Sequence, residues 1–173
     1  MRLFSLLPTI VLLGWGTVTI AANPSHIQQL IEKRECPDCD LSEVSLFGYD
    51  LTGANLQGAN LRQATLQGCT LNLSNLTDAM LEQANLGLAK FSGANLQGAK
   101  LAKANLYRAD LAKGDLTNAD LSEASLEGAN LQGADLTGAD LRKANLRRAN
   151  LQGALLTGAK MSGAIMPDGR RYK

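Results

Sequence analysis

Apolar and polar residues follow a five-residue period along most of this chain. A large apolar residue occupies every fifth position from Leu41 to Met166, which gives 26 units without an insertion. This residue is leucine except at Phe91, Met161 and Met166. A small residue, usually alanine, stands two positions earlier, and asparagine or aspartate often stands between the two. A short, strict period of this kind indicates a repeat architecture and not a layered globular domain.

Neither a straight strand nor a straight helix can bury a five-residue period. Residues two apart lie on one face of an extended segment, so the small residue and the leucine face the same way. Because five is odd, however, a continuous strand would reverse faces at every repeat, and a helix would spread the leucines around its circumference. The chain must therefore turn within each unit. The two residues after each leucine have turn chemistry, as in Thr52-Gly53 and Gln57-Gly58.

A short helix is expected before the repeats. Ile27, Leu30 and Ile31 fall at i, i+3 and i+4 and form one apolar stripe. Two start signals are present, since Asn23 can cap the helix ahead of Pro24 or Ser25 can open a capping box. A helix of two to three turns is marginal alone. We therefore expect it to dock its stripe on the first coil of the repeats as a cap.

The first 22 residues have the features of a secretory signal peptide. Arg2 is followed by an apolar or small stretch to Ile20, and Ala21-Ala22 supplies small residues for cleavage. A retained anchor is the alternative, because the stretch is just long enough to span a bilayer. Pro8 and two glycines favour cleavage. No later segment is apolar enough to cross a membrane, so no stable span is expected after removal of the leader.

The repeated units resemble a known family. Runs such as Ala54-Asn55-Leu56-Gln57-Gly58 look like the A-(D/N)-L-X-X pattern of pentapeptide-repeat proteins, over residues 39–166. The resemblance implies an all-β solenoid, a right-handed quadrilateral parallel β-helix with four units per coil. We divide the chain into a signal peptide (1–22), a cap helix with a Cys-containing linker (23–38), the β-helix (39–166) and a C-terminal tail (167–173). The leader and entry segment resemble exported cyanobacterial members, which implies a periplasmic or thylakoid-lumenal location.

Cys36 and Cys39 form the one motif with recognisable reactive chemistry. In register, both fall at inward positions, and an oxidising compartment favours a structural disulfide between them. A redox-active Cys-x-x-Cys pair and a metal site are the alternatives, although two thiols lack the further ligands that zinc needs. Cys69 takes an alanine position and is expected to be a buried free thiol. His26, the only histidine, is interpreted as a solvated residue at the helix start.

Charge narrows the range of partners. The net charge is +1, so the chain is neither basic enough for nucleic acid nor an acidic mimic of it. Residues twenty apart should stack, which predicts attraction between neighbouring coils. The predicted pairs are Arg62 with Glu82, Lys90 with Asp110, Lys100 with Asp120, Glu127 with Arg147, and Asp140 with Lys160. The aspartates at the outward position are explained by solvation and local backbone bonds.

Three surfaces remain as candidates for binding. The first is a basic corner that is predicted to gather five residues: Arg108, Arg142, Lys143, Arg147 and Arg148. It would suit an anionic partner. The second is an uncharged face that carries Gln57, Thr77, Gln97, Thr117, Thr137 and Thr157. The third is the C-terminal coil, which has no apolar lid in the sequence and could join two copies as a homodimer.

The sequence therefore favours a non-enzymatic exported scaffold or protein-binding module. We assign no catalytic residues, no metal ligands and no cofactor, and we expect an unidentified protein partner. One alternative is a DNA-mimicking topoisomerase (gyrase) binder, as some members of the family are, but that role calls for a strongly acidic rod in the cytosol. The other alternative is a redox protein that works through Cys36 and Cys39.

Overall fold

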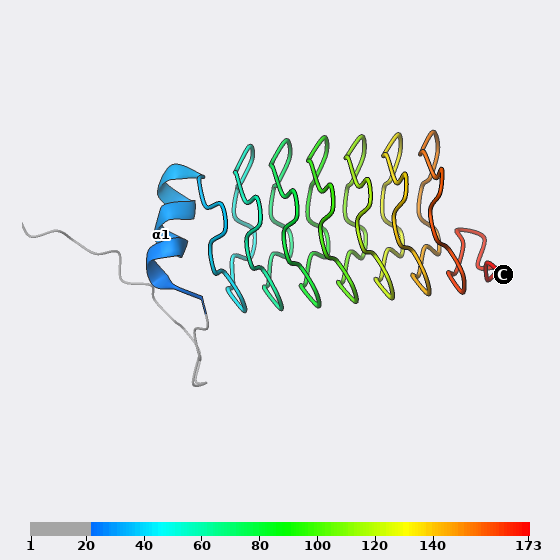
Figure 1. Cartoon of the computed structure of the whole chain (residues 1–173), viewed down its shortest axis with the longest axis horizontal. Helices are drawn as coiled ribbons and strands as arrows, with labels where there is room; N and C mark the ends of the chain where they lie inside the picture. Colours follow the sequence, from blue (N-terminus) through cyan, green and yellow to red (C-terminus); the bar gives the residue numbers. More distant parts are fainter. Residues whose placement is uncertain (1–21) are drawn as a thin grey trace, which may run out of the picture.

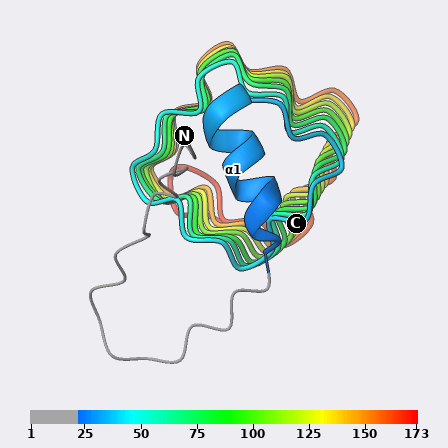
Figure 2. The ribbon, with the colours of Figure 1, turned by 90° about the vertical axis from the view of Figure 1, so that its left-hand side faces the viewer.

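The computed structural model describes residues 22–173, so the predicted signal peptide, apart from Ala22, lies outside the described residues. One helix, α1 (Pro24–Lys33), stands at one end of a rod of stacked coils (Figure 1). Within the described range the coils contain single-residue bridges and no longer strands. Between coils the bridges are parallel and join residues twenty apart, from Glu35 with Asn55 to Asn145 with Ile165. Each coil thus consists of four five-residue sides, and the four-sided outline is seen end-on in Figure 2.

Each side ends in a two-residue turn, which is closed by a backbone hydrogen bond and supported by a polar side chain of the repeat unit. The Ala54 N–H donates to the Leu51 carbonyl across the turn at 3.0 Å, and Gly53 between them has a φ of 68°. Glycine adopts this left-handed conformation without a steric penalty. The Asn55 side-chain oxygen accepts from the backbone N–H of Gln57 at 3.3 Å. Coil-to-coil bonds, such as Leu56 N–H to the Asn75 carbonyl at 2.7 Å, stack the sides.

The core is a set of leucine and alanine columns inside the rod. Every apolar centre from Leu41 to Leu146 is at most 2% exposed, and the alanines two positions earlier are similarly buried. Tyr49 takes one of these small positions in the first coil, but its side chain is 44% exposed. The interior therefore has room for a small residue there, and the larger ring is directed outward.

The coil stack begins at Glu35, inside the segment predicted as a linker. Cys36 occupies the position of a leucine, and its N–H donates to the Asn55 carbonyl at 2.8 Å. Asp38 completes the following turn with a φ of 54°. The sequence placed Cys36 at an inward position, but the repeats were predicted to begin at residue 39 because a cysteine replaces the leucine of this first unit.

Helix α1 lies across the opening of the first coil (Figure 2). Of its predicted apolar stripe, Leu30 is fully buried, Ile27 is partly buried and Ile31 is 43% exposed. Asn23 is the N-cap, because its side-chain oxygen accepts from the Ser25 N–H at 3.0 Å. Among the described residues, no helix has both the length and the apolar character needed to cross a bilayer.

The C-terminal tail folds back on the last coil. The Met166 N–H donates to the Arg170 carbonyl and the Tyr172 N–H donates to the Ala164 carbonyl, both at 2.7 Å. This antiparallel pairing covers one of the four sides. On the other sides the interior residues Leu151, Leu156 and Met161 are only partly buried. The two ends of the rod are thus covered to different extents.

Candidate functional site

The cysteine pair lies where α1 meets the first coil. Cys36 and Cys39 are joined by a disulfide, and the two residues are 0% and 3% exposed. The Cys36 Sγ lies 3.2 Å from the carbonyl oxygen of His26 on the helix. A bond so little exposed to solvent is poorly placed for attack by an external thiolate.

His26 makes a contact that the sequence did not indicate. Its ring is partly buried, and Nδ1 accepts the backbone N–H of Asp40 at 3.0 Å. The Asn23 N–H donates to the carbonyl of the same Asp40 at 3.3 Å. The expectation of a simply solvated side chain is wrong, because the helix lies close enough to the first coil for the ring to reach its backbone.

Cys69 is buried in the alanine column, as expected. Its Sγ lies 2.7 Å from the Leu46 carbonyl, to which the thiol donates. Burial raises the pKa of this thiol. Since the thiolate is the reactive form, Cys69 has the character of a packing residue.

The outward aspartates serve the turns. The Asp50 and Asp135 carboxylates accept the N–H groups of Thr52 and Thr137 at 3.0 and 2.9 Å. Hydrogen bonds from these threonines lower the pKa of both carboxyls. Local backbone bonds therefore account for these residues, as the sequence suggested. In residues 22–173 no three His, Cys, Asp or Glu residues are grouped to hold a metal ion.

The predicted charge stacking is confirmed as an ion pair at one place. Arg62 and Glu82 are 3.0 Å apart. Backbone bridges join Lys90 to Asp110, Lys100 to Asp120 and Asp140 to Lys160, but these side chains form no ion pair within 4.0 Å in the described part of the chain. Glu127 does not pair with Arg147 either, and instead accepts the Asn145 side-chain amide at 3.3 Å.

A ladder of ion pairs follows one corner of the rod. We call it the charge-paired corner, made of the turns at 42–43, 62–63, 82–83, 102–103, 122–123 and 142–143. Glu123 lies 3.9 Å from Lys103 and 3.8 Å from Lys143, in the coils before and after it. Arg142 binds Asp140 at 2.6 Å, and its hydrogen bond holds the pKa of that carboxyl below its usual value. The cations at this corner are largely neutralised.

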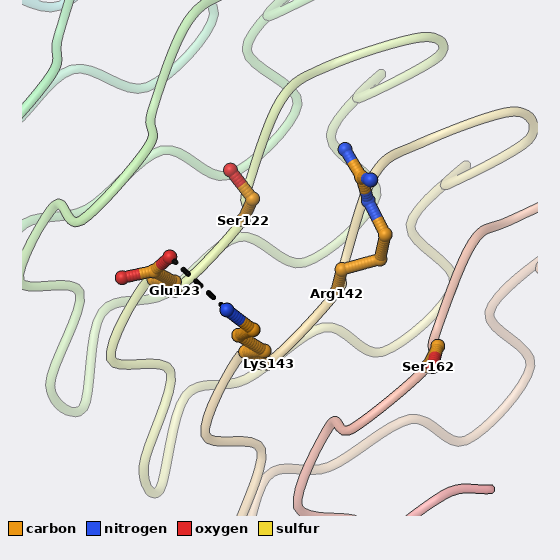
Figure 3. Close-up of a pocket in the computed structure, with 5 residues that line it drawn as sticks. All are labelled: Ser122, Glu123, Arg142, Lys143 and Ser162. Carbon is orange, nitrogen blue, oxygen red and sulfur yellow. Dashed lines mark ion pairs between the residues drawn. The ribbon is translucent and has the colours of Figure 1, made fainter.

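A shallow hollow opens on the same corner. Its lining consists of Ser122, Glu123, Arg142, Lys143 and Ser162 (Figure 3). The Lys143 ammonium points across it toward Glu123. Because the basic groups here already have carboxylate partners, the hollow offers an anion little unpaired positive charge.

The next corner has a different character. We call it the aromatic–arginine corner: the turns at 47–48, 67–68, 87–88, 107–108, 127–128 and 147–148, with Tyr49 directly after the first. Coil-to-coil hydrogen bonds of 2.9 to 3.1 Å connect these turns without a gap, from the Gly48 N–H to the Pro167 carbonyl. The Arg108 guanidinium lies over the Tyr107 ring at 5.3 Å. In residues 22–173 no carboxylate lies within 4.0 Å of Arg108, Arg147 or Arg148.

The five predicted basic residues therefore do not share one corner. Arg142 and Lys143 lie on the charge-paired corner, whereas Arg108, Arg147 and Arg148 lie on the aromatic–arginine corner. The expectation of a single cluster is wrong because a turn separates residues five apart in each coil. Residues gather on one corner only at spacings of twenty.

The sequence did not indicate that exposed apolar residues gather on the aromatic–arginine corner. The structure has eight exposed large hydrophobic residues in its described part, and four of them lie here. These are Phe47 (66% exposed), Tyr49 (44%), Leu88 (50%) and Tyr107 (41%). Writing the sequence in columns of twenty residues would have aligned their turns.

The threonine and glutamine face lies at the corner diagonally opposite, since its turns are two sides away in each coil. The residues after Thr77 and Pro37 in these turns are Asp78 and Asp38, so the corner is not free of charge. The side chain of Thr77 donates to Asn75 at 2.7 Å and is thereby occupied locally. This face is the weaker candidate for a partner.

Comparison with known proteins identifies the family. The chain matches the pentapeptide repeats family in eight copies, over residues 39–78, 54–93, 89–128 and 124–163. The chain belongs to this family. No curated protein sequence gives a significant match.

Solved structures of the family resemble the chain. HetL, a pentapeptide repeat protein involved in heterocyst differentiation regulation from the cyanobacterium Nostoc sp. strain PCC 7120, is 36% identical over 80% of this chain and 76% of its own, with a TM-score of 0.48. QnrB1, a plasmid-mediated fluoroquinolone resistance protein, is 22% identical over 74% of this chain and 65% of its own, with a TM-score of 0.71. A pentapeptide repeat protein from the Arabidopsis thaliana thylakoid lumen is 26% identical over 81% and 74%, with a TM-score of 0.23.

Proposed function

We propose that this protein is a non-enzymatic exported scaffold that binds a protein partner in a periplasm or thylakoid lumen. The side chains that could act as nucleophiles or as proton acceptors are buried or already bonded. Cys36 and Cys39 are buried in a disulfide, the ring of His26 accepts a backbone N–H, and the Cys69 thiol is buried. The location rests on the predicted leader, and a disulfide is in keeping with an oxidising compartment.

The observation that carries the proposal is the unpaired positive charge of one corner. Arg108, Arg147 and Arg148 have no carboxylate within 4.0 Å in the described chain, while Lys103, Arg142 and Lys143 on the neighbouring corner have one. Arginine is enriched at protein interfaces and binds carboxylates in a bidentate manner. A rigid rod also presents these groups at fixed spacing, which reduces the entropy lost on binding. An acidic region of a partner protein would fit this corner, whereas Arg142 and Lys143 are weaker candidates.

Charge reversal on two corners of one coil tests this function. Mature protein beginning at residue 23 would be cross-linked in extracts of its native compartment and the captured proteins compared between variants. Arg147→Glu/Arg148→Glu should lose the specific partner. Arg142→Glu/Lys143→Glu is the matched control, because it makes the same charge change on the charge-paired corner of the same coil, and it should retain the partner. If both variants capture the partner equally well, the aromatic–arginine corner is not its binding surface.

The two alternatives have less support. A DNA-mimicking topoisomerase binder calls for a strongly acidic rod, but the chain has 17 basic and 16 acidic residues. Inhibition of DNA supercoiling by micromolar protein would support that alternative. A redox function needs a thiolate that substrates can reach, and the two cysteines are almost fully buried.

We also propose that α1 acts as a cap for the first coil. An uncovered coil exposes unpaired backbone groups that invite association with other chains. Leu30 is buried between the helix and the coil, and the Gln29 side chain donates to the Glu35 carbonyl at 2.8 Å. The disulfide at Cys36 and Cys39 holds the chain compact directly after the helix.

A further inference from the structure

The aromatic–arginine corner combines two kinds of exposed side chain in a defined order along the rod. Phe47 and Tyr49 lie at the end near α1, Leu88 follows two coils later, Tyr107 and Arg108 come in the next coil, and Arg147 and Arg148 lie two coils beyond. The corner is therefore apolar at its N-terminal end and cationic at its C-terminal end.

Isolated exposed apolar residues are normal on a protein surface. The distribution here is different, because half of the exposed large hydrophobic residues fall on one of four corners. Tyrosine, phenylalanine and arginine are also enriched at interfaces, and tyrosine and arginine at their energetic centres as well. The clustering and the composition both indicate a surface that is covered by another molecule.

We propose that this corner binds an extended protein segment that has apolar anchors at one end and carboxylates at the other. The proposal rests on the function proposed above and extends its site from the arginines to the whole length of the corner. Charge complementarity determines what binds at the cationic end. From the turn at 47–48 to the turn at 147–148, the corner contains three arginines and only one acidic residue, Glu127. An unpaired cation on a partner would meet repulsion along most of this end.

The spacing of the coils sets the length of the bound segment. Five coils separate Phe47 from Arg147, and at about 4.8 Å per coil this is about 24 Å. A segment in the extended polyproline II conformation advances about 3.1 Å per residue, so about eight residues span the distance. Anchors two coils apart, such as Phe47 and Leu88, correspond to residues about three apart in the segment, which face the same way because this conformation has three residues per turn.

A single-stranded nucleic acid is the competing ligand, because aromatic and cationic residues also bind bases and phosphates. Bases and phosphates alternate along such a strand, so its binding surface would need aromatic rings interleaved with cations. Here the rings of Phe47 and Tyr49 lie about three coils from Arg108, and one face of the Tyr107 ring is already occupied by that arginine. The separation of apolar and cationic ends favours a protein segment.

Peptide binding tests the inference directly. The probe is a fluorescein-labelled ten-residue peptide with leucine and phenylalanine three positions apart at one end and three glutamates at the other. Fluorescence anisotropy would be measured with the mature protein at two salt concentrations. We expect saturable binding that weakens with added salt, and at least tenfold weaker binding of a peptide in which the same residues are interspersed.

Two sets of variants separate the two ends of the corner. Phe47→Ser/Leu88→Ser should weaken binding about tenfold and leave its salt dependence intact. Arg108→Gly/Arg148→Gly should weaken binding and reduce its salt dependence. Glycine suits both positions, because their φ angles are 52° and 59°. The matched control is Leu73→Ser, which removes an apolar residue that is 71% exposed on another corner and should have no effect.

The outcomes distinguish this inference from the proposed function. If only the arginine variants weaken binding, the acidic partner stands and the apolar half of the site is wrong. If Leu73→Ser weakens binding as much as Phe47→Ser/Leu88→Ser, the corner is not a specific site. Tighter binding of a ten-nucleotide thymidine oligomer would replace the protein segment by a nucleic acid. A further outcome is that the peptide fails to bind up to about millimolar concentration while cross-linked capture still depends on Arg147 and Arg148. That result would overturn this inference and leave the proposed function standing.

Discussion

Individual residues in this protein have roles that depend on their position in the five-residue unit. Leu96 and Gln97 are neighbours, but Leu96 is 0% exposed and Gln97 is exposed. The leucine fills a column of the core, whereas the glutamine side chain projects from a turn. Position in the unit thus decides how much a substitution costs.

Leu96→Ala should lower the free energy of unfolding by about 2 to 5 kcal/mol, because the rod cannot close the cavity that the substitution leaves. Gln97→Ala, the adjacent control, should change it by no more than about 0.5 kcal/mol. Chemical denaturation followed by circular dichroism would measure both. Comparable losses in the two variants would contradict the assignment of inward and outward positions.

At the level of elements, helix α1 and the first coil are joined by few contacts of different kinds. Leu30 is buried, the ring of His26 accepts the Asp40 N–H, and the Cys36–Cys39 disulfide lies beneath the helix. The stability of a solenoid is approximately a sum of nearest-neighbour terms. A change at this end should therefore remain local.

Cys36→Ser/Cys39→Ser should increase hydrogen exchange in α1 and the first coil and leave the middle of the rod unchanged. The closed loop is short, so the loss of stabilisation should be about 2 kcal/mol or less. Cys69→Ala is the control, because alanine is the usual residue of that column, and it should alter exchange at neither place. Faster exchange around Leu96 in the serine variant would show that the two ends are coupled.

On the scale of the whole molecule, the rod has one end beneath a helix and one end that is only partly covered. The tail pairs with one side of the last coil, and Leu151, Leu156 and Met161 stay partly buried. In the described chain the backbone N–H groups of Leu151 and Leu156 have no backbone acceptor. An edge of this kind favours association.

Homodimerisation through the C-terminal coil therefore remains a prediction. Light scattering over increasing concentrations should detect a dimer, and Leu155→Lys should shift it to monomer. Leu155 is 55% exposed and stands where other coils have asparagine or aspartate, so the lysine should be tolerated by the fold. Leu73→Lys, the same change at a 71% exposed site in the second coil, should leave the dimer intact. A wild-type protein that stays monomeric near millimolar concentration would refute the prediction.

The sequence by itself determined the repeat, its inward and outward positions and the short helix. These features follow from local rules: a five-residue period must turn in every unit, and Ile27, Leu30 and Ile31 fit one face of a helix. The burial of Cys69 and the turn bonds of Asp50 and Asp135 follow from the same register.

Only the tertiary structure decided which residues meet. Arg142 and Arg147 are five apart in the chain but lie on different corners, while Phe47 and Arg147 are a hundred residues apart and share one. Pairing also depends on side-chain reach, so Glu123 bridges two lysines whereas Glu127 turns to Asn145 and leaves Arg147 unpaired. The physical reason is that stacking twenty-residue coils converts sequence separation into height along the rod, and this conversion brings the exposed aromatic rings and the free arginines onto one surface.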